Sequence, residues 1–374
     1  MAQPPEQYDW LTLRQLKGVA GTQPEPWCVR VQIEASTVRE ASTGKPYHEL
    51  KLNDGTESLV WRVFDNSPVY QEVSQCRRGS WIELSAHWAG GKFGLEPRNP
   101  FLRPLRDEEI EVLLAGDEET RDRQKLDFET ITNLTGQLAD PRLRGLCALF
   151  LQQHGVRFQR AAAARDYHHA RRGGLVEHVA QMMRCAVQIC VAYPALNRDL
   201  MVAGVLFHDC GKLWENNYTE DGFSMPHTLH GELIGHISMG MELVNKLWRA
   251  LVETPEAAAW QTLEPGSEMV RLHLLHLIGS HHGEMQFGSP VLPKTPEAIA
   301  LHYIDNLDAK MEMFRRGYDT SAELADGIYE RVRPLPANLV RPLASVPPPL
   351  VSAAVREDAG DGEDDSSLSE EPAR

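Results

Sequence analysis

The sequence has no apolar stretch that approaches the roughly 18 to 20 residues needed to cross a membrane. Its N-terminus, MAQPPEQYDW, lacks the charged and apolar regions of a secretion signal. Its six cysteines are scattered, and none forms a CxxC pair. This excludes a zinc ribbon and a disulfide-stapled fold, because both need closely spaced cysteines. We therefore expect a cytoplasmic protein without a membrane partner.

An excess of positive charge is also lacking, since the formal net charge is -15 at pH 7. That value argues against a general nucleic-acid coat, but the charges are unevenly placed. Residues 351–374 hold eight acidic and two basic side chains, whereas residues 27–106 hold nine acidic and eleven basic ones. The direction of this contrast suits a polyanionic ligand on the N-terminal part of the chain.

The length of 374 residues suits two domains and a tail. The predicted segments are a polar lead-in (1–23), a strand-rich domain (24–106), a charged helical connector (107–126), an all-α domain (127–330) and a disordered tail (331–374). The tail is predicted to be disordered because it is rich in proline and acidic residues and has too few hydrophobic residues to fold.

The N-terminal domain shows the two-residue period of β-strands. Val29, Val31 and Ile33 alternate with polar residues, and Asn53-Asp54-Gly55 is a hairpin signal. Further short strands are expected on both sides of Gly90-Gly91. About five short strands in this segment predict a five-stranded β-barrel of the OB type.

Such a barrel binds single strands by stacking bases on exposed aromatic rings beside cationic side chains. The candidates for contact with RNA or DNA are Tyr47, Trp61, Phe64, Trp88, Phe93, Arg30, Lys45, Lys51, Arg62 and Lys92. His168 and His169, in the following domain, are candidates for contacts with the nucleic acid through its phosphates, or for support of a metal ligand. The alternative for each aromatic residue is a place in the core, because aromatic side chains favour strands for packing alone.

From Phe128 onward the spacing of apolar residues is helical. Helices are predicted at 127–138, 141–154, 175–193, 197–209, 229–251, 267–281 and 295–316. The last begins with Thr295 as the N-cap and Pro296 in the first turn. The predicted fold class is therefore a multidomain α and β protein, a five-stranded β-barrel followed by an all-α helical bundle.

Thirteen of the fifteen histidines lie in the helical domain, most of them in short clusters. A helical bundle has little structural use for so many imidazoles, but several helices can each direct one ligand into its core. The proposed metal ligands are His178, His208, Asp209, His236, His281, His282 and Asp305. A single histidine on a helix is more often a packing or surface group, so the interpretation depends on the whole set. His227 and His230 are candidates for ligand support or phosphate contacts, and Asp308 could cap a helix, form an ion pair or support a ligand.

The ligand set contains nitrogen and oxygen but no sulfur, which suits Mn²⁺, Fe²⁺, Co²⁺, Ni²⁺ or Zn²⁺ better than Ca²⁺ or Mg²⁺. We predict two divalent ions with Asp209 as the bridging carboxylate. Two ions about 3.5–4 Å apart can hold a phosphodiester, activate water and stabilise the leaving oxygen. The predicted catalytic residues are His208, Asp209 and Lys212, and Lys212 is expected to pair with a phosphate oxygen.

In chain order, the predicted ligands follow the pattern H...HD...H...HH...D, which resembles the dinuclear members of the HD-domain metal-dependent phosphohydrolase superfamily. Five runs resemble more closely the YhaM-type 3′-to-5′ exoribonucleases, which join an OB fold to an HD domain. These runs are FQRAAAARDYHHARRGGLVEHV, GVLFHDCGK, GELIGHI, LIGSHHGEMQFGSP and EAIALHYIDNLDAKM. With the barrel, the resemblance covers roughly residues 24–320.

The resemblance implies a nuclease, assisted foremost by Mn²⁺, that releases nucleoside 5′-monophosphates from the 3′ end of single-stranded RNA. DNA is a second candidate substrate, and a homo-oligomer is one candidate for the assembly. Two other interpretations stay open from the residues. One is a phosphohydrolase of a small nucleotide or cyclic dinucleotide, with the barrel as a regulatory module. The other is a nucleic-acid-binding factor whose metal site is structural.

Overall fold

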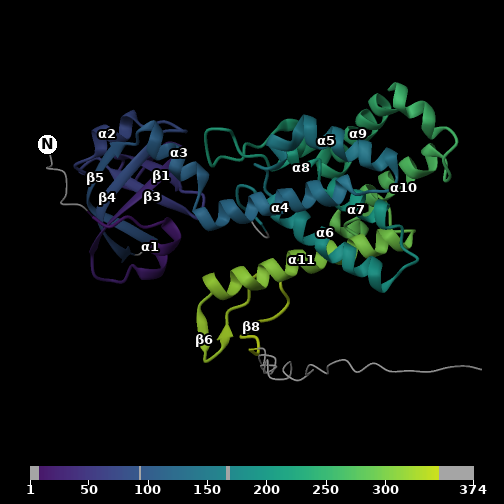
Figure 1. The fold of residues 1–374 in the computed structure, drawn as a ribbon. Coiled ribbons are helices and arrows are strands. Elements are labelled where there is room, and N and C mark those ends of the chain that lie inside the picture. The colour runs from purple at the N-terminus through teal and green to yellow at the C-terminus, as the bar shows by residue number, and fades with distance from the viewer. Residues whose placement is uncertain (1–7, 92–93, 166–168, 345–374) are drawn as a thin grey trace, which may run out of the picture.

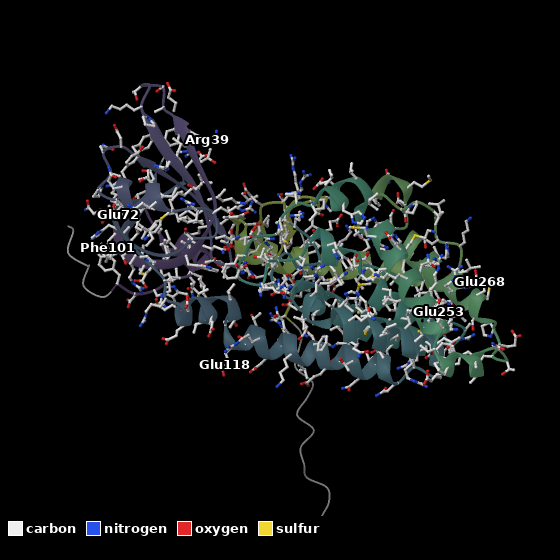
Figure 2. All side chains as sticks on the ribbon, turned by 90° about the horizontal axis from the view of Figure 1, so that it is seen from above. Arg39, Glu72, Phe101, Glu118, Glu253 and Glu268 are labelled. Carbon is white, nitrogen blue, oxygen red and sulfur yellow. The ribbon has the colours of Figure 1, made fainter. Side chains whose placement is uncertain are left out.

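The computed structural model of the chain describes residues 8–91, 94–165 and 169–344. An N-terminal antiparallel sheet of five strands is followed by a helical region that lies beside it (Figure 1). Figure 2 places Arg39 and Glu72 on the sheet side, whereas Glu253 and Glu268 lie at the far end of the helical region. The predicted order of a strand-rich domain and then a helical domain is confirmed.

The five strands are β1 (Glu25–Glu40), β2 (Pro46–Asn53), β3 (Ser58–Phe64), β4 (Trp81–Gly91) and β5 (Gly94–Pro104). They pair in the order β3-β2-β1-β4-β5, and every neighbouring pair is antiparallel. The expected two-residue period is present in β1, since Val29, Val31 and Ile33 are buried. Within the described residues β3 and β5 are the two edges and do not pair, so the sheet is open.

The inner face of the sheet buries two aromatic residues that the sequence offered as base-stacking candidates. Trp61 is 4% exposed and Trp88 is 0% exposed. The indole N–H of Trp88 also donates to the carbonyl of Trp27 at 3.0 Å. The prediction that these two rings stack on bases is wrong, because strand alternation places Trp61 on the same side as Leu59 and Val63, in the core.

The polar lead-in also belongs to the sheet domain. It forms helix α1 (Leu13–Val19), which begins at the N-cap Thr12. Leu13 and Leu16 are buried among the core side chains of the sheet. The backbone N–H of Leu13 donates to Asp54 Oδ2 at 2.6 Å, which ties the helix to the β2–β3 turn. The domain therefore starts earlier than the predicted boundary at residue 24.

The helical region follows the predicted helices closely. Its long helices are α4 (Glu118–Gly136), α5 (Pro141–Phe158), α6 (Gly174–Ala192), α7 (Arg198–Phe207), α9 (Leu229–Val252), α10 (Ser267–Ser280) and α11 (Pro296–Thr320). The shorter elements are α2 (Tyr70–Gln75), in the sheet domain, α3 (Asp107–Ala115), α8 (Lys212–Glu215), η1 (Pro255–Trp260) and η2 (Met285–Phe287). As predicted, Thr295 caps α11 and Pro296 is its first residue.

The predicted connector at 107–126 is not a separate unit. Helix α3 is followed by α4, which begins behind the N-cap Asp117 and continues to Gly136. Ile131, in the second half of α4, is buried in the helical core. One continuous helix therefore leads out of the connector into the helical domain, and the boundary predicted between 126 and 127 falls inside it.

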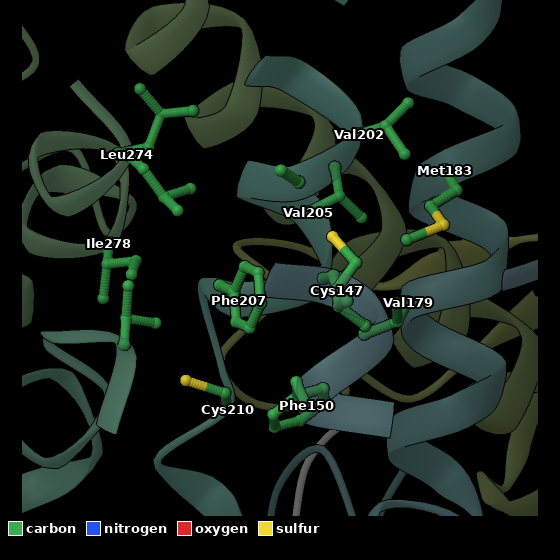
Figure 3. Packing of buried hydrophobic residues seen from close by; sticks show 14 of the residues in the cluster. Cys147, Phe150, Val179, Met183, Val202, Val205, Phe207, Cys210, Leu274 and Ile278 are labelled. Atoms are coloured by element: carbon green, nitrogen blue, oxygen red, sulfur yellow. The ribbon is translucent and has the colours of Figure 1, made fainter. Parts of the chain in front are cut away.

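A large apolar core surrounds α7 (Figure 3). Phe150 of α5, Val179 of α6, Phe207 of α7 and Ile278 of α10 are all fully buried in it. Burial of a side chain of this size contributes about 1.5–3 kcal/mol to stability. Because α7 lies within this core, the residues that follow its C-terminal end are held in a fixed position.

The chain after α11 forms a small antiparallel sheet of β6 (Glu323–Ala325), β7 (Ile328–Tyr329) and β8 (Leu339–Val340). Leu335 and Leu339 are buried together with Met313 of α11. Disorder was predicted from residue 331, and this is wrong for 331–344, because the few hydrophobic residues among the prolines pack against α11. The remainder of the predicted tail, 345–374, lies outside the described residues.

No helix within the described ranges is long and apolar enough to span a membrane. All six cysteines are free, as their scattered positions predict. Neither disulfides nor cysteine-rich metal sites therefore contribute to holding the described part of the chain together.

Candidate metal centre

The His-Asp doublet lies where α7 ends inside the helical core. The side chain of Asn197 caps the start of this helix by accepting the backbone N–H of Leu200 at 3.0 Å. His208 and Asp209, directly after its last residue, are 0% and 1% exposed. Two polar side chains placed this deeply destabilise the fold unless each has partners.

Two glycines bring α9 close to the doublet. A Cβ at Gly211 would lie 1.9 Å from the carbonyl oxygen of His236, so only glycine allows this approach. Gly235 has φ 71° and interrupts the helical path of α9 directly before His236. Beyond this break, the Nε2 atom of His236 lies 3.5 Å from Asp209 Oδ1.

Asp209 directs its two carboxylate oxygens toward two different groups of histidines. Oδ2 lies 3.2 Å from Nε2 of His208 and 3.8 Å from Nε2 of His178. Oδ1 lies 3.5 Å from Nε2 of His236 and 3.6 Å from Nε2 of His281. This is the arrangement expected of a carboxylate that bridges two ions.

The first group joins α6, the α7 end and α11. The Nε2 atoms of His178 and His208 lie 3.3 Å apart, and Asp305 Oδ1 lies 3.3 Å from Nε2 of His178. His178, His208 and Asp209 place their ligand atoms within 4.8 Å of one another. Two imidazole nitrogens that face each other at this distance need a proton or a cation between them.

The second group joins α9 and the end of α10. His236, His281 and His282 also have ligand atoms within 4.8 Å of one another. Their rings lie close together, with centroids 4.3 Å apart for His281 and His282 and 5.2 Å apart for His236 and His282. All seven predicted ligands are therefore brought to one place, in two groups that share Asp209.

Backbone carbonyls orient three of the imidazoles. Nδ1 of His208 donates to the carbonyl of Val205, and Nδ1 of His281 donates to that of Ile278, both at 2.8 Å. Nδ1 of His282 donates to the carbonyl of Phe287 at 2.6 Å. A proton on Nδ1 leaves the lone pair of Nε2 directed into the centre, as metal ligation requires.

Carboxylates orient the other two imidazoles. Asp308 Oδ2 lies 2.7 Å from Nδ1 of His178, and Glu215 Oε2 lies 3.0 Å from Nδ1 of His236. Support of a ligand was one of three roles left open for Asp308 by the sequence, whereas Glu215 was missed. Its position three residues after Lys212 is an ordinary helical spacing, and only the fold shows that it meets His236.

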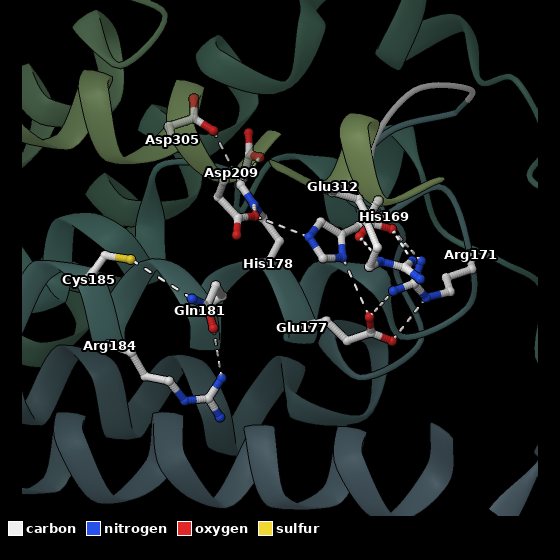
Figure 4. Close-up of polar contacts among 12 residues, drawn as sticks. His169, Arg171, Glu177, His178, Gln181, Arg184, Cys185, Asp209, Asp305 and Glu312 are labelled. Atoms are coloured by element: carbon white, nitrogen blue, oxygen red, sulfur yellow. Dashed lines mark hydrogen bonds and ion pairs between the residues drawn. The ribbon is translucent and has the colours of Figure 1, made fainter. Parts of the chain in front are cut away.

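A buried charge network that includes His169, Glu177 and Arg171 continues outward from His178 (Figure 4). Asp308 Oδ2 also lies 3.1 Å from Nε2 of His169, whose Nδ1 lies 3.5 Å from Glu177 Oε2. Arg171 contacts Glu177 and also donates to Glu312 of α11 at 2.8 Å. His169 thus supports His178 through Asp308, which is one of the two roles predicted for it; its buried position does not favour the other, a contact with a nucleic acid.

The electrostatics of the second group favour a cation. Burial lowers the pKa of His281 and lowers that of His282 to about 4, so both rings are neutral near pH 7. Burial would raise the pKa of Asp209, but the charges of Lys212 and His208 hold it well below its usual range. Neutral imidazoles beside an ionised carboxylate are the protonation states that a metal ion requires.

In the first group, protons and a metal ion compete for the same atom. Burial would lower the pKa of His178, but hydrogen bonds to Asp305 and Asp308 outweigh burial and raise it to about 10. Asp305 faces Nε2 of this ring, where an ion would be bound. A cation at this position would take over the interaction with Asp305 that now favours the proton.

The donor atoms fit divalent metal ions. Asp209 Oδ1, Nε2 of His236 and Nε2 of His281 are buried and make no hydrogen bond to another described atom. Buried polar atoms without a partner destabilise a fold by roughly 1–3 kcal/mol each. Metal coordination would give all three atoms a partner. The centre can therefore hold ions, and ions would also remove this destabilisation.

Lys212 lies at the centre but contacts a ligand. Its Nζ atom is 2.6 Å from Asp209 Oδ2, and the side chain is buried. In this arrangement the ammonium group is engaged by the bridging carboxylate. The predicted pairing with a phosphate oxygen would require Lys212 to turn away from Asp209 or to contact both groups.

The remaining candidate histidines lie elsewhere. His227 and His230 are exposed at the start of α9. His302 donates from Nδ1 to the carbonyl of His281 at 3.0 Å, which supports the turn after α10. His168 lies outside the described residues.

The exposed side of β2 and β3, here called the outer face of the sheet, carries other nucleic-acid candidates. Tyr47 and Phe64 are opposite each other across these strands, and their rings stack with centroids 5.1 Å apart. Phe64 is 45% exposed. This pair offers an accessible aromatic surface, unlike Trp61 and Trp88.

The cationic candidates on the outer face are paired with acidic residues. Nε of Arg62 donates to Glu49 at 3.0 Å, and Nζ of Lys51 lies 2.9 Å from Glu34. Such exposed pairs contribute only about 0–1 kcal/mol to stability and can exchange partners. The candidates Arg30 and Lys45 are likewise paired, with Glu83 and Asp65, and Lys92 and Phe93 lie outside the described residues.

Comparison with known proteins agrees with this geometry. Residues 175–310 match the family model described as the HD domain, and this range contains every predicted metal ligand. The helical region therefore contains an HD domain.

Relatives extend the similarity to most of the chain. The 3′-5′ exoribonuclease YhaM of Bacillus subtilis is 34% identical over 288 residues, which are 77% of this chain and 86% of the relative. The proteins of the same name from Bacillus velezensis and Bacillus pumilus are 34% and 33% identical over the same shares. The chain belongs to the YhaM family of HD-domain proteins.

Proposed function

We propose that this protein is a metal-dependent 3′-to-5′ exoribonuclease that releases nucleoside 5′-monophosphates from single-stranded RNA. One observation carries the proposal: a chain of the YhaM family directs the two oxygens of Asp209 toward two histidine groups. A phosphodiesterase that uses two ions needs such a shared carboxylate.

The residues of the centre have different roles in hydrolysis. The seven side chains would hold two divalent ions, and the chemistry that such ions supply is polarisation of a phosphodiester and a lowered pKa of water. His236 and Asp305 have side chains 14% and 17% exposed, so the phosphate approaches from the side where these two reach solvent. Lys212 adds positive charge beside Asp209 and offsets the negative charge that develops on the phosphate.

We assign strand capture to the sheet domain, as a barrel of the OB type. The order β3-β2-β1-β4-β5 is compatible with a partly open barrel, and OB folds bind oligonucleotides on the face of strands 2 and 3. On this chain that face carries the stacked pair of Tyr47 and Phe64, with Arg62 and Lys51 beside it. Stacking accepts any base, which suits an enzyme that shortens a strand one nucleotide at a time.

Mn²⁺ is the proposed metal, with Co²⁺, Fe²⁺, Ni²⁺ and Zn²⁺ as alternatives. Five imidazoles and two carboxylates are donors of intermediate softness, which suit these ions better than Mg²⁺. Titration of metal-free protein with each ion, followed by analysis of metal content, would rank them.

Labelled RNA tests the function directly. With Mn²⁺, RNA labelled at its 5′ end should give a ladder that shortens with time, and RNA labelled at its 3′ end should release labelled mononucleotide at once. A 3′-phosphate block should slow the reaction, and a DNA strand of the same sequence measures sugar preference. Release of internal fragments, or turnover of small nucleotides alone, would contradict the proposal.

A further inference from the structure

The loop between α8 and α9, residues 218–224, reaches from the HD domain to the sheet domain (Figure 1). Phe223 in this loop is 5% exposed, and its ring meets that of Trp81 edge to face with centroids 5.4 Å apart. A Cβ at Gly55, in the β2–β3 turn, would lie 2.7 Å from the ring of Phe223. The ring therefore occupies a closely fitted site on the sheet domain.

Gln32 of β1 fixes the same loop through its side-chain amide. Its Oε1 accepts the backbone N–H of Phe223 at 2.8 Å, and its Nε2 donates to the carbonyl of Asp221 at 3.4 Å. Arg78 adds a contact to Ser224 Oγ at 2.9 Å. A buried amide that uses both its donor and its acceptor on one loop specifies a single position of that loop.

Arginines of the HD domain hold the loop and its flank from the other side, through backbone carbonyls. The contacts are Arg160 to the carbonyl of Tyr218, Arg165 to that of Met225, and Arg172 to those of Thr219, Glu220 and Gly222. These three arginines, which precede His178 in the chain, are therefore engaged by the loop and its flank. Their guanidinium groups are not an open phosphate-binding surface in this arrangement.

The loop and the arginine that holds it, Arg172, are both close in the chain to residues that support the metal centre. The loop begins three residues after Glu215, which holds His236. Arg172 lies between His169 and His178 in the chain, the two residues joined through Asp308. A change in the loop position would therefore be felt at the supports of both histidine groups.

We propose that loop 218–224 is a clasp that holds the sheet domain in one position relative to the metal centre, so that a strand bound on the sheet is presented to the centre. This inference rests on the proposed exoribonuclease function. The helices α3 and α4 already connect the two domains, and the clasp supplies a second attachment. Fixing two binding elements in a suitable geometry raises the effective concentration of one at the other.

The first test compares Phe223→Ala with the control Phe101→Ala, which removes a half-buried ring on β5 of the same domain. Each variant is assayed on RNA of about 30 nucleotides and on RNA of about 4, since OB folds bind roughly 4–16 nucleotides. Phe223→Ala should raise KM for the long RNA about tenfold and reduce the nucleotides removed per binding event. Its kcat on the short RNA should stay within about twofold of the wild type, and Phe101→Ala should behave as the wild type on both.

A second variant retains the Phe223 side chain and changes its neighbour. A Cβ at Gly222 would lie 2.6 Å from the amide of Gln32, and that amide is held by its own hydrogen bonds. Gly222→Ala should therefore displace the loop and reproduce the long-RNA defect. Gln32→Ala and Gly222→Ala both disturb the contact between Gln32 and the loop. In the double variant, their effects on KM for the long RNA should therefore not add. Small-angle scattering should show a larger radius of gyration for the clasp variants.

The outcomes separate this inference from the proposed function. If the wild type degrades neither RNA, the exoribonuclease function fails. If the wild type degrades both, but Phe223→Ala and Gly222→Ala change long and short substrates by the same factor, the loop is only structural and the clasp is overturned. Unchanged KM on the long RNA for both variants, with a changed scattering profile, also overturns it, because the domains would then act without a fixed geometry.

Discussion

The metal centre and the outer face of the sheet hold their functional side chains in different ways. At the centre, His178, His208 and His281 are fully buried, and each has a partner on Nδ1 that fixes the direction of Nε2. On the outer face, Tyr47 and Phe64 are supported mainly by each other, and the cations beside them pair with exposed or half-buried carboxylates.

This difference corresponds to two kinds of task. Ligation and hydrolysis need groups held within a fraction of an ångström, so the surrounding chain orients every ligand. Capture of a single strand needs surfaces that accept any base, so stacking rings and exchangeable ion pairs suffice. Changes at the centre should therefore act on kcat and metal binding, whereas changes on the outer face should act on KM.

Replacement of the bridging carboxylate should give the largest effect. Asp209→Asn leaves one acceptor oxygen where both histidine groups need one, so kcat/KM should fall by on the order of 10⁴-fold. The measurement is release of 3′-terminal label at saturating Mn²⁺. Asp319→Asn, an exposed position on the same α11 that carries Asp305, is the control. Retention of more than about a tenth of the activity would show that the centre does not depend on this carboxylate.

Removal of a support should cost less than removal of a ligand. Asp308→Asn takes away the charged acceptor on Nδ1 of His178, and such partners change metal affinity or activity by about 10–100-fold. The midpoint of activation by Mn²⁺ should shift to higher concentration, with activity largely regained at saturation. A lower kcat with an unchanged midpoint would mean that Asp308 does not act through His178.

The outer face should respond in KM alone. Phe64→Ala removes one stacking surface, which is worth about 1–3 kcal/mol per base, so KM should rise by roughly 5- to 100-fold. The control is Val60→Ala, an exposed residue on the same strand and face. If kcat falls as well, or if both variants raise KM equally, the contrast between the two regions is not valid.

The buried charged residues around Glu312, next to the metal centre, should stabilise the fold more than the charged residues on the outer face. This stabilisation should depend on pH. Burial would raise the pKa of Glu312, but hydrogen bonds from Arg315 and Arg171 outweigh it and lower the pKa to about 2. A carboxylate with a lowered folded-state pKa contributes stability above its unfolded value of about 4.3. That contribution is lost as the pH falls toward the folded value.

The test is thermal unfolding of metal-free protein. Glu312→Gln should lower stability by on the order of 2 kcal/mol at pH 7, and the difference from the wild type should shrink between pH 4.5 and 2.5. The comparison variant is Glu49→Gln, whose partners Arg39 and Arg62 are more exposed, and it should lose at most about 1 kcal/mol. Equal losses of stability in the two variants would show that the buried charges stabilise the fold no more than the charges of the outer face.

The sequence predicts the helical half of the molecule well, for local reasons. Apolar spacing and caps such as Thr295 depend on neighbouring residues, so the helices are found close to where they are expected. The predicted metal ligands, which the fold brings together, are found in the sequence because imidazole and carboxylate side chains occur in the order of the family pattern. The sequence left the role of Asp308 open and did not point to Glu215, because the imidazoles that these carboxylates contact come from distant parts of the chain.

The sheet domain shows a different limit. Strand alternation identifies which residues share a face, but it does not say which face becomes the core. For that reason Trp61 and Phe64 looked equivalent, although one is buried and the other exposed. The apolar residues of loop 218–224 show no regular spacing. The loop contacts the sheet domain through Gln32 and Trp81, which lie more than a hundred residues away in the chain, so the sequence does not reveal this contact.

The break in α9 at Gly235 divides this helix into two parts that can evolve separately. The part from His236 onward is bound to the centre and to the core, where Leu243, Val244 and Leu247 are buried. The part before the break is largely exposed, so its residues can be exchanged without moving His236. Among relatives that retain the same centre, this first stretch is where sequence drift and adaptation to new substrates should concentrate, while the glycine itself should be kept.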